Sequence, residues 1–325
     1  MFKIILALTF LFTLANANEP YKLGEGVKLS SSLPIYIGGY ISLEYRETEH
    51  QYTYNVDDIA LMSYANINRF SYMVELEYKE FYQKKYINNI ADESTNSKLY
   101  TERLYVDYNY NENYLLRLGK YNSPIGFWNL LPINVLRSTT SSPMTNELIY
   151  PTFTTGVLLS YLYFSQDEIQ VDVILQHNDS IDTSYNNYKI DKHYGLGATY
   201  TRNNFSTKVN FGSFHQKQED QTLYYLLSTK YETNNFEIMG AFGEQYSSNL
   251  NLNNKASYIQ YLYHINQKHH AILRVESYKD SSNDEAFVVV AYTYRPLYPI
   301  ALKSEYQIHK DDDINQFLIS LSVLF

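Results

Sequence analysis

Arg69-Phe70-Ser71-Tyr72-Met73-Val74-Glu75-Leu76-Glu77-Tyr78-Lys79 alternates without a break: the even-numbered positions are aromatic or aliphatic, and the odd-numbered positions hold every charge. Successive side chains of a β-strand point to opposite faces, so this stretch predicts a strand with one apolar and one wet face. Because a charge facing lipid is costly, charges confined to one parity favour a strand that spans a membrane.

The same alternation recurs along the chain. It gives about sixteen candidate strands of roughly 9 to 13 residues, the length that a tilted membrane strand needs. We therefore expect an all-β fold, a closed antiparallel transmembrane barrel in a single domain over residues 18–325. The candidate strands are 33–47, 56–66, 69–81, 99–110, 114–121, 156–164, 168–177, 193–201, 204–214, 222–232, 236–246, 256–265, 269–279, 285–294, 297–309 and 314–325.

The connections between these strands are expected to alternate strictly between tight and long, which is the asymmetry between the two ends of a transmembrane barrel. An even strand number then puts both chain ends at the end with tight turns. The tight connections are 67–68, 111–113, 165–167, 202–203, 233–235, 266–268 and 295–296, and the long ones include 83–98, 178–192, 247–255 and 280–284.

Composition fits this fold and excludes other classes. Aromatic residues make up 16% of the chain, with 36 Tyr and 16 Phe, and amphipathic rings of this kind gather where a barrel wall meets the membrane surface. No Cys is present, which rules out disulfides and thiolate metal sites. A net charge of -9 argues against a nucleic-acid partner.

The first residues have the layout of a secretory signal peptide. Lys3 precedes an apolar run from Ile4 to Leu14, and Ala15-Asn16-Ala17 is a small-residue cleavage site. The apolar run is too short for a membrane helix, and no later stretch approaches one. We expect residues 1–17 to be removed on export.

The chain ends in Phe317-Leu318-Ile319-Ser320-Leu321-Ser322-Val323-Leu324-Phe325, another alternating stretch with an aromatic last residue. It resembles the terminal strand by which bacterial outer-membrane barrels are recognised by the barrel-assembly machinery. An open sheet edge cannot exist in lipid, so this strand is expected to pair with the first one.

The longest connection, residues 122–155, is rich in apolar residues and prolines and should pack inside the barrel. Here the chain resembles bacterial porins, in which the third external loop folds inward and narrows the channel. Leu116-Arg117-Leu118-Gly119-Lys120-Tyr121 and Ser123-Pro124-Ile125-Gly126-Phe127-Trp128 are similar to the segment entering that loop in phosphate-selective-type porins. The candidate constriction residues are Pro124, Phe127, Trp128, Arg137 and Glu147.

The resemblance implies an outer-membrane porin of a Gram-negative bacterium, with no enzyme activity and no cofactor. Small hydrophilic solutes or ions would pass through a water-filled channel, which a barrel of about sixteen strands is wide enough to hold. Lipid would surround the barrel, and a homotrimer is common in this group. The loop offers Arg137 alone, with Glu147 opposing it, rather than the Arg and Lys ladder of phosphate-selective porins.

Alternation also predicts which charges face the interior. Basic and acidic candidates nearly balance, so they indicate no ion selectivity, and most are expected to pair across strands. The basic candidates are Arg46, Arg69, Lys79, Arg103, Arg117, Lys208, Lys230, Arg274 and Lys303. The acidic candidates are Glu44, Glu75, Glu77, Asp107, Asp172, Glu237, Glu276 and Glu305.

Two other classes of function stay open. An adhesin or receptor barrel with no open channel is the first alternative, and an outer-membrane enzyme is the less favoured second. Ser213 and His215 share a face but have no evident carboxylate partner, and His269 and His270 point to opposite faces, which argues against a metal site with His264. Asp311-Asp312-Asp313 lacks the Gly and distal Glu of a calcium loop.

Overall fold

The computed structural model describes residues 23–29, 33–88, 90–183, 186–217, 221–247, 252–310 and 314–325. The expected signal peptide, residues 1–17, and the Asp311-Asp312-Asp313 stretch lie outside the described residues. Within the described ranges, no helix has the length and apolar character to cross a membrane.

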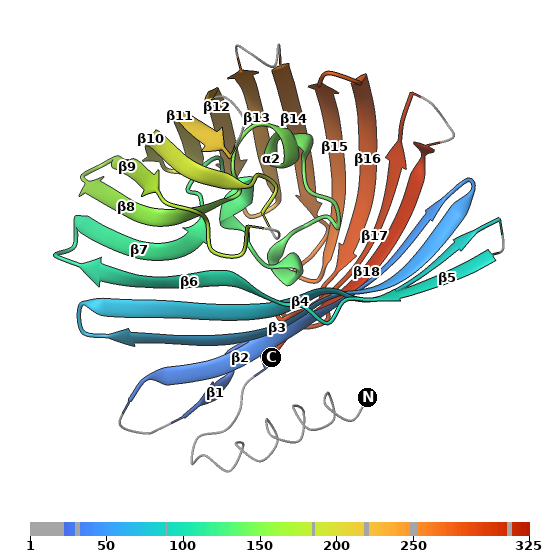
Figure 1. Ribbon diagram of the computed structural model, residues 1–325, viewed down its shortest axis with the longest axis horizontal. Helices are drawn as coiled ribbons and strands as arrows, with labels where there is room; N and C mark the ends of the chain where they lie inside the picture. Colours follow the sequence, from blue (N-terminus) through green and yellow to red (C-terminus); the bar gives the residue numbers. More distant parts are fainter. Residues whose placement is uncertain are drawn as a thin grey trace.

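Sixteen long antiparallel strands form one closed ring, as the alternation predicted (Figure 1). Each pairs with its sequence neighbours, and two short strands, β1 and β5, are attached to β2 and β4. The strands are β1 Val27–Lys28, β2 Ile35–Thr48, β3 Gln51–Ile67, β4 Phe70–Ile87, β5 Ile90–Thr95, β6 Leu99–Asn109, β7 Tyr114–Asn122, β8 Phe153–Phe164, β9 Glu168–His177, β10 Ile190–Arg202, β11 Phe205–Gln216, β12 Gln221–Glu232, β13 Phe236–Ser247, β14 Leu252–His264, β15 His269–Lys279, β16 Asp284–Tyr294, β17 Ile300–Ile308 and β18 Gln316–Leu324.

The ring closes where the terminal strand meets the first long strand, as predicted. β18 pairs with β2 from Phe317 opposite Glu47 to Leu324 opposite Tyr40. Phe325 then extends the ladder, since its N–H donates to the Gly39 carbonyl at 2.7 Å and its carbonyl accepts from the Gly39 N–H at 2.8 Å. Every strand of the ring therefore has two neighbours, which satisfies the backbone polar groups in the absence of water.

The two faces of the wall differ as the sequence predicted. On β15, Leu273 and Val275 are 47% and 45% exposed on the outside, whereas Arg274 and Glu276 are buried inside. Aromatic rings gather on the outer face at the end with tight turns, where Phe70 packs on Tyr108 and Tyr114 on Tyr161. An apolar band bordered by such rings is the surface that lipid and its interface require.

The expected strict alternation of tight and long connections is wrong. β2 and β3 are joined only by Glu49 and His50, and residues 83–98 form a hairpin of β4 with β5 rather than an open loop. Four residues, 280–283, join β15 to β16, fewer than the five, 295–299, that join β16 to β17 at the opposite end. In the long early strands, Tyr52 and Tyr86 lie opposite each other on β3 and β4 and their rings stack, with centroids 4.5 Å apart.

We call the end of the barrel that holds the connections after β3, β6, β8, β10, β12, β14 and β16 the turn end, and the opposite end the loop end. The connection from β7 to β8 departs from the loop end and lies within the ring (Figure 1).

Candidate functional site

The inward loop, residues 123–152, fills part of the barrel interior with short helices. It contains the 3-10 helices η1, Trp128–Leu130, and η2, Asn134–Leu136, and one α-helical turn, α2, Met144–Leu148. Residue 122 and residues 153–155, which the sequence assigned to the loop, belong to β7 and β8. Val135 packs beside Tyr40 of β2, and Trp128 beside Met239 of β13, so the loop reaches distant parts of the wall.

The loop enters the interior at Gly126, where its chain turns sharply. Gly126 has a φ of +63°, and a Cβ there would meet the Leu226 side chain of β12 at 3.0 Å. Its N–H donates to Asn210 Oδ1 at 3.1 Å, and Asn210 Nδ2 donates to the Pro124 carbonyl at 3.2 Å. Glycine is needed here, because the backbone has a positive φ and lies too close to the barrel wall to leave room for a side chain.

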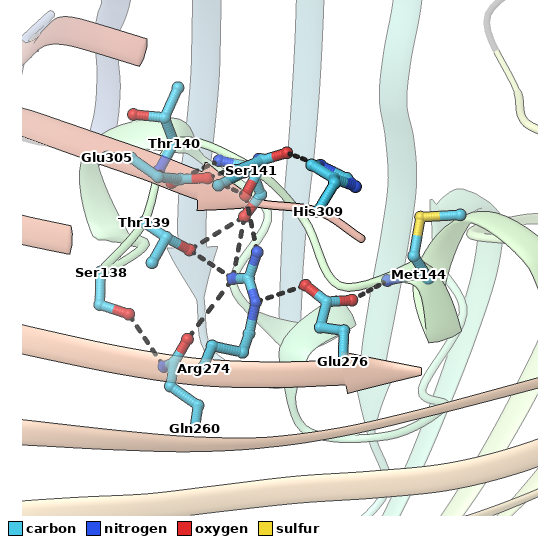
Figure 2. Close-up of polar contacts among 11 residues, drawn as sticks. Ser138, Thr139, Thr140, Ser141, Met144, Gln260, Arg274, Glu276, Glu305 and His309 are labelled. Atoms are coloured by element: carbon cyan, nitrogen blue, oxygen red, sulfur yellow. Dashed lines mark hydrogen bonds and ion pairs between the residues drawn. The ribbon is translucent and has the colours of Figure 1, made fainter. Parts of the chain in front are cut away.

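Arg274 of β15 is the main anchor of the loop's middle (Figure 2). Its guanidinium donates to Thr139 Oγ1 at 2.8 Å and to Ser141 Oγ at 2.6 Å, and it pairs with Glu276. Glu276 in turn accepts the Met144 N–H at 2.7 Å, at the start of α2. One buried ion pair on the wall thus holds the loop both at Thr139 and Ser141 and at Met144, where α2 begins.

Glu305 of β17 binds the same part of the loop, at Thr140 and Ser141 (Figure 2). Its carboxylate accepts the N–H groups of Thr140 and Ser141, at 3.0 and 3.2 Å, and the Ser141 hydroxyl. Gln307 Nε2 donates to it as well, at 2.8 Å. A carboxylate that accepts several donors at once is a strong and directional anchor.

Two further cations bind carbonyl groups of the loop. Lys303 Nζ donates to the Asn134 carbonyl at 2.5 Å. Arg295, in the turn after β16, donates to the Val135 carbonyl at 2.5 Å and to the Arg137 carbonyl at 3.0 Å. Burial lowers the pKa of Arg295. The described residues place no carboxylate at ion-pair distance from Arg295, so its charge is met by carbonyl dipoles alone.

The loop leaves the interior under the β9–β10 connection. Asn187 accepts the Thr152 N–H at 3.0 Å and donates to the Tyr150 carbonyl at 2.9 Å, and the Tyr188 hydroxyl donates to the Leu148 carbonyl at 2.8 Å. The Tyr150 hydroxyl donates to Asn146 Oδ1 at 2.6 Å, and burial raises the pKa of Tyr150. No pattern in the sequence indicated this clamp.

These contacts change the role of four charges that the sequence assigned to the wall of the channel. Arg274, Glu276, Lys303 and Glu305 face the interior, but the loop covers them and each is at most 1% exposed. They hold the loop rather than face open water.

Ten of the other thirteen candidate wall charges pair with one another inside the barrel. Arg69 lies exposed in the turn before β4 and not on a strand, and Glu77 and Lys79 line a cavity. The pairs are Glu75 with Arg103, Asp107 with Arg117 at 2.6 Å, Asp172 with Lys208 at 3.6 Å, Glu237 with Lys230 at 3.1 Å, and Glu44 with Arg46 at 3.0 Å.

A cavity of about 720 Å³ opens between the inward loop and the β2–β6 part of the wall, toward the loop end. Its lining is mostly polar and includes Glu44, Arg46, Glu77 and Lys79 of the candidate wall charges. Asp58 and Glu102, which the alternation did not identify, line it as well. The Tyr40 hydroxyl donates to Glu102 at 3.1 Å and contacts Glu77 at 3.4 Å.

β-Bulges bring the unexpected acids inward. The β4–β6 register shifts between Glu75 and Leu76, which leaves Glu102 as an extra residue beside Arg103, and both side chains are buried. A second shift in the β3–β4 register, between Val56 and Asp58, leaves Asp57 unpaired in the ladder. An inserted residue breaks the period-2 rule locally, so parity counting misses these side chains.

A second cavity, of about 350 Å³, lies on the other side of the loop, toward the turn end. Residues 128–138 separate the two cavities, and we call this stretch the partition. Its Asn129, Pro132, Asn134 and Arg137 line the loop-end cavity. Its turn-end side carries Trp128, Leu130, Leu131, Leu136 and Ser138. The partition is therefore amphipathic, with a polar and a mainly apolar side.

The five candidate constriction residues are divided by this arrangement. Arg137 and Glu147 line the loop-end cavity, whereas Phe127 and Trp128 line the turn-end cavity. Arg137 is tied back to its own loop, donating to the Leu131 carbonyl at 2.9 Å. Pro124 lies at the entry beside Asn210.

The residues considered for an enzyme are not brought together into one group. His215 does have a carboxylate partner, Asp191 at 2.6 Å, which the sequence did not reveal, but Ser213 accepts a hydrogen bond from Gln221 instead. His264 and His270 contact each other at 2.8 Å, while His269 contacts Tyr292 on the outer face. Over the described ranges, no group of three or more His, Cys, Asp or Glu is placed to hold a metal ion.

No family model matches the chain, and no curated protein matches it. Solved structures do. OmpF of Salmonella typhi in complex with daunomycin is similar with a TM-score of 0.62 at 9% identity, covering 90% of this chain and 97% of that one. An anion-selective porin from Comamonas acidovorans gives a TM-score of 0.61 at 10% identity, covering 90% and 99%. OmpT of Vibrio cholerae, in vitro folded and in trimer form, gives 0.58 at 13% identity, covering 90% and 99%.

At these identities the likeness concerns the fold. The chain has the fold of bacterial outer-membrane porins: a closed ring of sixteen antiparallel strands.

Proposed function

We propose that the protein is an outer-membrane porin through which small hydrophilic solutes or ions diffuse passively. The observation that carries the proposal is the arrangement of the interior: a sixteen-stranded ring with two cavities, of about 720 and 350 Å³, on either side of an anchored partition. A ring of this strand number is wide enough to leave space for water beside an inward loop. Any solute that crosses must pass the partition, which therefore limits the flow.

Several finer parts of the proposal follow from it. The wall charges that line the loop-end cavity, Glu44, Arg46, Glu77 and Lys79, would face the permeating solute. Lipid would cover the apolar outer face, and the barrel would be exported after removal of residues 1–17. The strand ending at Phe325 would be read by the barrel-assembly machinery, and the barrels would associate as homotrimers. The protein would need no cofactor and would catalyse no reaction.

Reconstitution into planar lipid bilayers tests the channel. The full chain should give stepwise ion conductance, and removal of residues 127–143 should enlarge each step. A matched control removes the exposed strand β5, Ile90–Thr95, which pairs only with β4 and lies away from the partition. It should leave the step size unchanged.

The outcomes separate the alternatives. Absence of steps from a correctly folded barrel would overturn the porin assignment and favour an adhesin or receptor barrel without an open channel. Steps of equal size before and after the deletion would reject the constriction role of the inward loop. A heat-sensitive band of high mass in mild-detergent gels is expected for the trimer, and a monomer band under the same conditions would contradict it.

A further inference from the structure

The turn-end cavity differs in chemistry from the rest of the interior. The partition exposes apolar side chains to it, including Leu130, which is 47% exposed, and the half-buried Leu131 and Leu136, and the neighbouring Phe127 is half-buried there too. Leu262 of β14 lines the opposite side. A purely hydrophilic passage gains nothing from such a surface, and burying exposed apolar side chains against a ligand is favourable.

One cation without a carboxylate partner among the described residues faces this apolar surface. Arg295 lines the cavity and donates only to carbonyl oxygens, with no carboxylate at ion-pair distance among the described residues. The other cation of the lining, Lys230, is already paired with Glu237 at 3.1 Å and with Glu232 at 2.7 Å. The His264 and His270 rings share one hydrogen bond, between their Nδ1 atoms at 2.8 Å. The free charge of the cavity is thus positive.

From this combination we infer that the turn-end cavity is a binding site for small amphipathic carboxylates, with a ring or short aliphatic body on the partition and the carboxylate toward Arg295. Guanidinium groups recognise carboxylates through charge-assisted hydrogen bonds. A volume of about 350 Å³ fits a body of one ring, and a mostly apolar lining with a small number of charged and polar groups is the usual composition of a small-molecule site. The inference goes beyond the proposed function, because a barrel can bind such a ligand whether or not it conducts.

The chain provides its own probe. Trp128 is the only tryptophan in the sequence, and its ring lines this cavity. Its fluorescence should therefore report occupation of the site without any added label. The protein is best held in lipid nanodiscs, because detergent chains would compete for the apolar surface.

Three ligands separate the contributions of charge and ring. Phenylacetate should change Trp128 fluorescence saturably. Phenylacetamide, which keeps the ring and loses the charge, and acetate, which keeps the charge and loses the ring, should each bind at least tenfold more weakly. Equal binding of phenylacetate and phenylacetamide would overturn the inference, as would stronger binding of the cationic phenethylammonium, or no saturable change with any of them.

Variants test the residues. Arg295→Gln should weaken phenylacetate binding at least tenfold and remove the preference over phenylacetamide. Lys85→Gln, in the loop-end cavity, should change neither. Because Arg295 also holds the partition, a second pair avoids that contact: Leu130→Glu should abolish phenylacetate binding by repulsion, whereas Leu130→Gln should retain most of it. Equal effects of the two Leu130 variants would reject the carboxylate as the recognised group.

Discussion

The Nε of Arg274 lies 2.6 Å from Oε1 of Glu276, two residues further along β15, and both side chains are fully buried between the barrel wall and the inward loop (Figure 2). Each of the two side chains also forms hydrogen bonds with the loop. Arg274 also holds Thr139 and Ser141, and Glu276 also holds the Met144 N–H. The pair therefore joins the wall to the loop, and its loss should be felt in both stability and conductance.

Arg274→Gln should destabilise the folded barrel by about 3–5 kcal/mol, because it leaves Glu276 buried without its partner. Conductance should become larger or noisier as the loop loses its anchor. Lys279→Gln is the control on the same strand. It breaks the exposed pair with Asp284, which is worth about 0–1 kcal/mol. Urea unfolding followed by gel mobility measures both variants, and equal midpoints would show that Arg274 is not an anchor.

Glu305 and Ser141 should be coupled energetically, since the carboxylate accepts both the N–H and the hydroxyl of Ser141. A double-mutant cycle of Glu305→Ala and Ser141→Ala should give a coupling energy of about 0.5–3 kcal/mol. The exposed Ser281, in the β15–β16 connection, provides the reference, because its replacement by Ala should be additive with Glu305→Ala. Additivity in the Ser141 cycle would contradict the observed contact.

Gly126→Ala should cost about 1–2 kcal/mol, because a side chain at its φ of +63° is strained and its Cβ would press on Leu226. The loop entry should shift, so unfolding and single-channel conductance are both measured. Gly240→Ala on β13 is the comparison. That residue has no positive φ, and an added Cβ would lie 3.0 Å from the Tyr258 carbonyl oxygen. A smaller effect at position 126 than at 240 would refute the conformational argument.

If the loop-end cavity is the permeation path, cations should be preferred. Its charged lining has seven acidic residues, Glu44, Asp57, Asp58, Glu77, Glu80, Glu102 and Glu147, and four basic ones, Arg46, Lys79, Lys85 and Arg137. The reversal potential in a tenfold KCl gradient measures this preference. The measurement is made at low salt, because at 0.1 M the interaction between charges more than about 10 Å apart is largely screened.

The double variant Asp58→Asn with Glu102→Gln should move that potential toward zero. Glu93→Gln, on the exposed β5, should leave it unchanged. A wild-type channel that prefers anions would show that these carboxylates do not govern passage.

Deletion of Phe325 should impair assembly of the barrel in the outer membrane, because the residue adds two backbone hydrogen bonds to Gly39 at the closing seam. The fraction of heat-resistant folded barrel in membranes measures this. Refolding of the purified chain in detergent separates recognition from stability. If both routes fail to the same extent, the role of Phe325 is structural; if neither is affected, the seam does not depend on it.

The strand pattern could be predicted from the sequence because it is a local property. Alternation sets which side chains face lipid, as at Leu273 and Val275, and the terminal stretch 317–325 supplies the closing edge. The long apolar connection also predicted an inward loop, since such a segment has to be sheltered from water. These conclusions rest only on the order of residues that are close together in the sequence and on the two-residue period of a β-strand.

Tertiary structure alone decided the character of the interior. Arg274 and Glu305 lie 31 residues apart on different strands, and only the closed ring brings both to Ser141, where they become anchors instead of channel charges. Glu102 turns inward because a register shift inserts it beside Arg103. Packing between distant segments sets such contacts and bulges, so no local sequence pattern predicts them. The two-sided partition and the chemistry of each cavity depend on these contacts, so they too could be seen only in the tertiary structure.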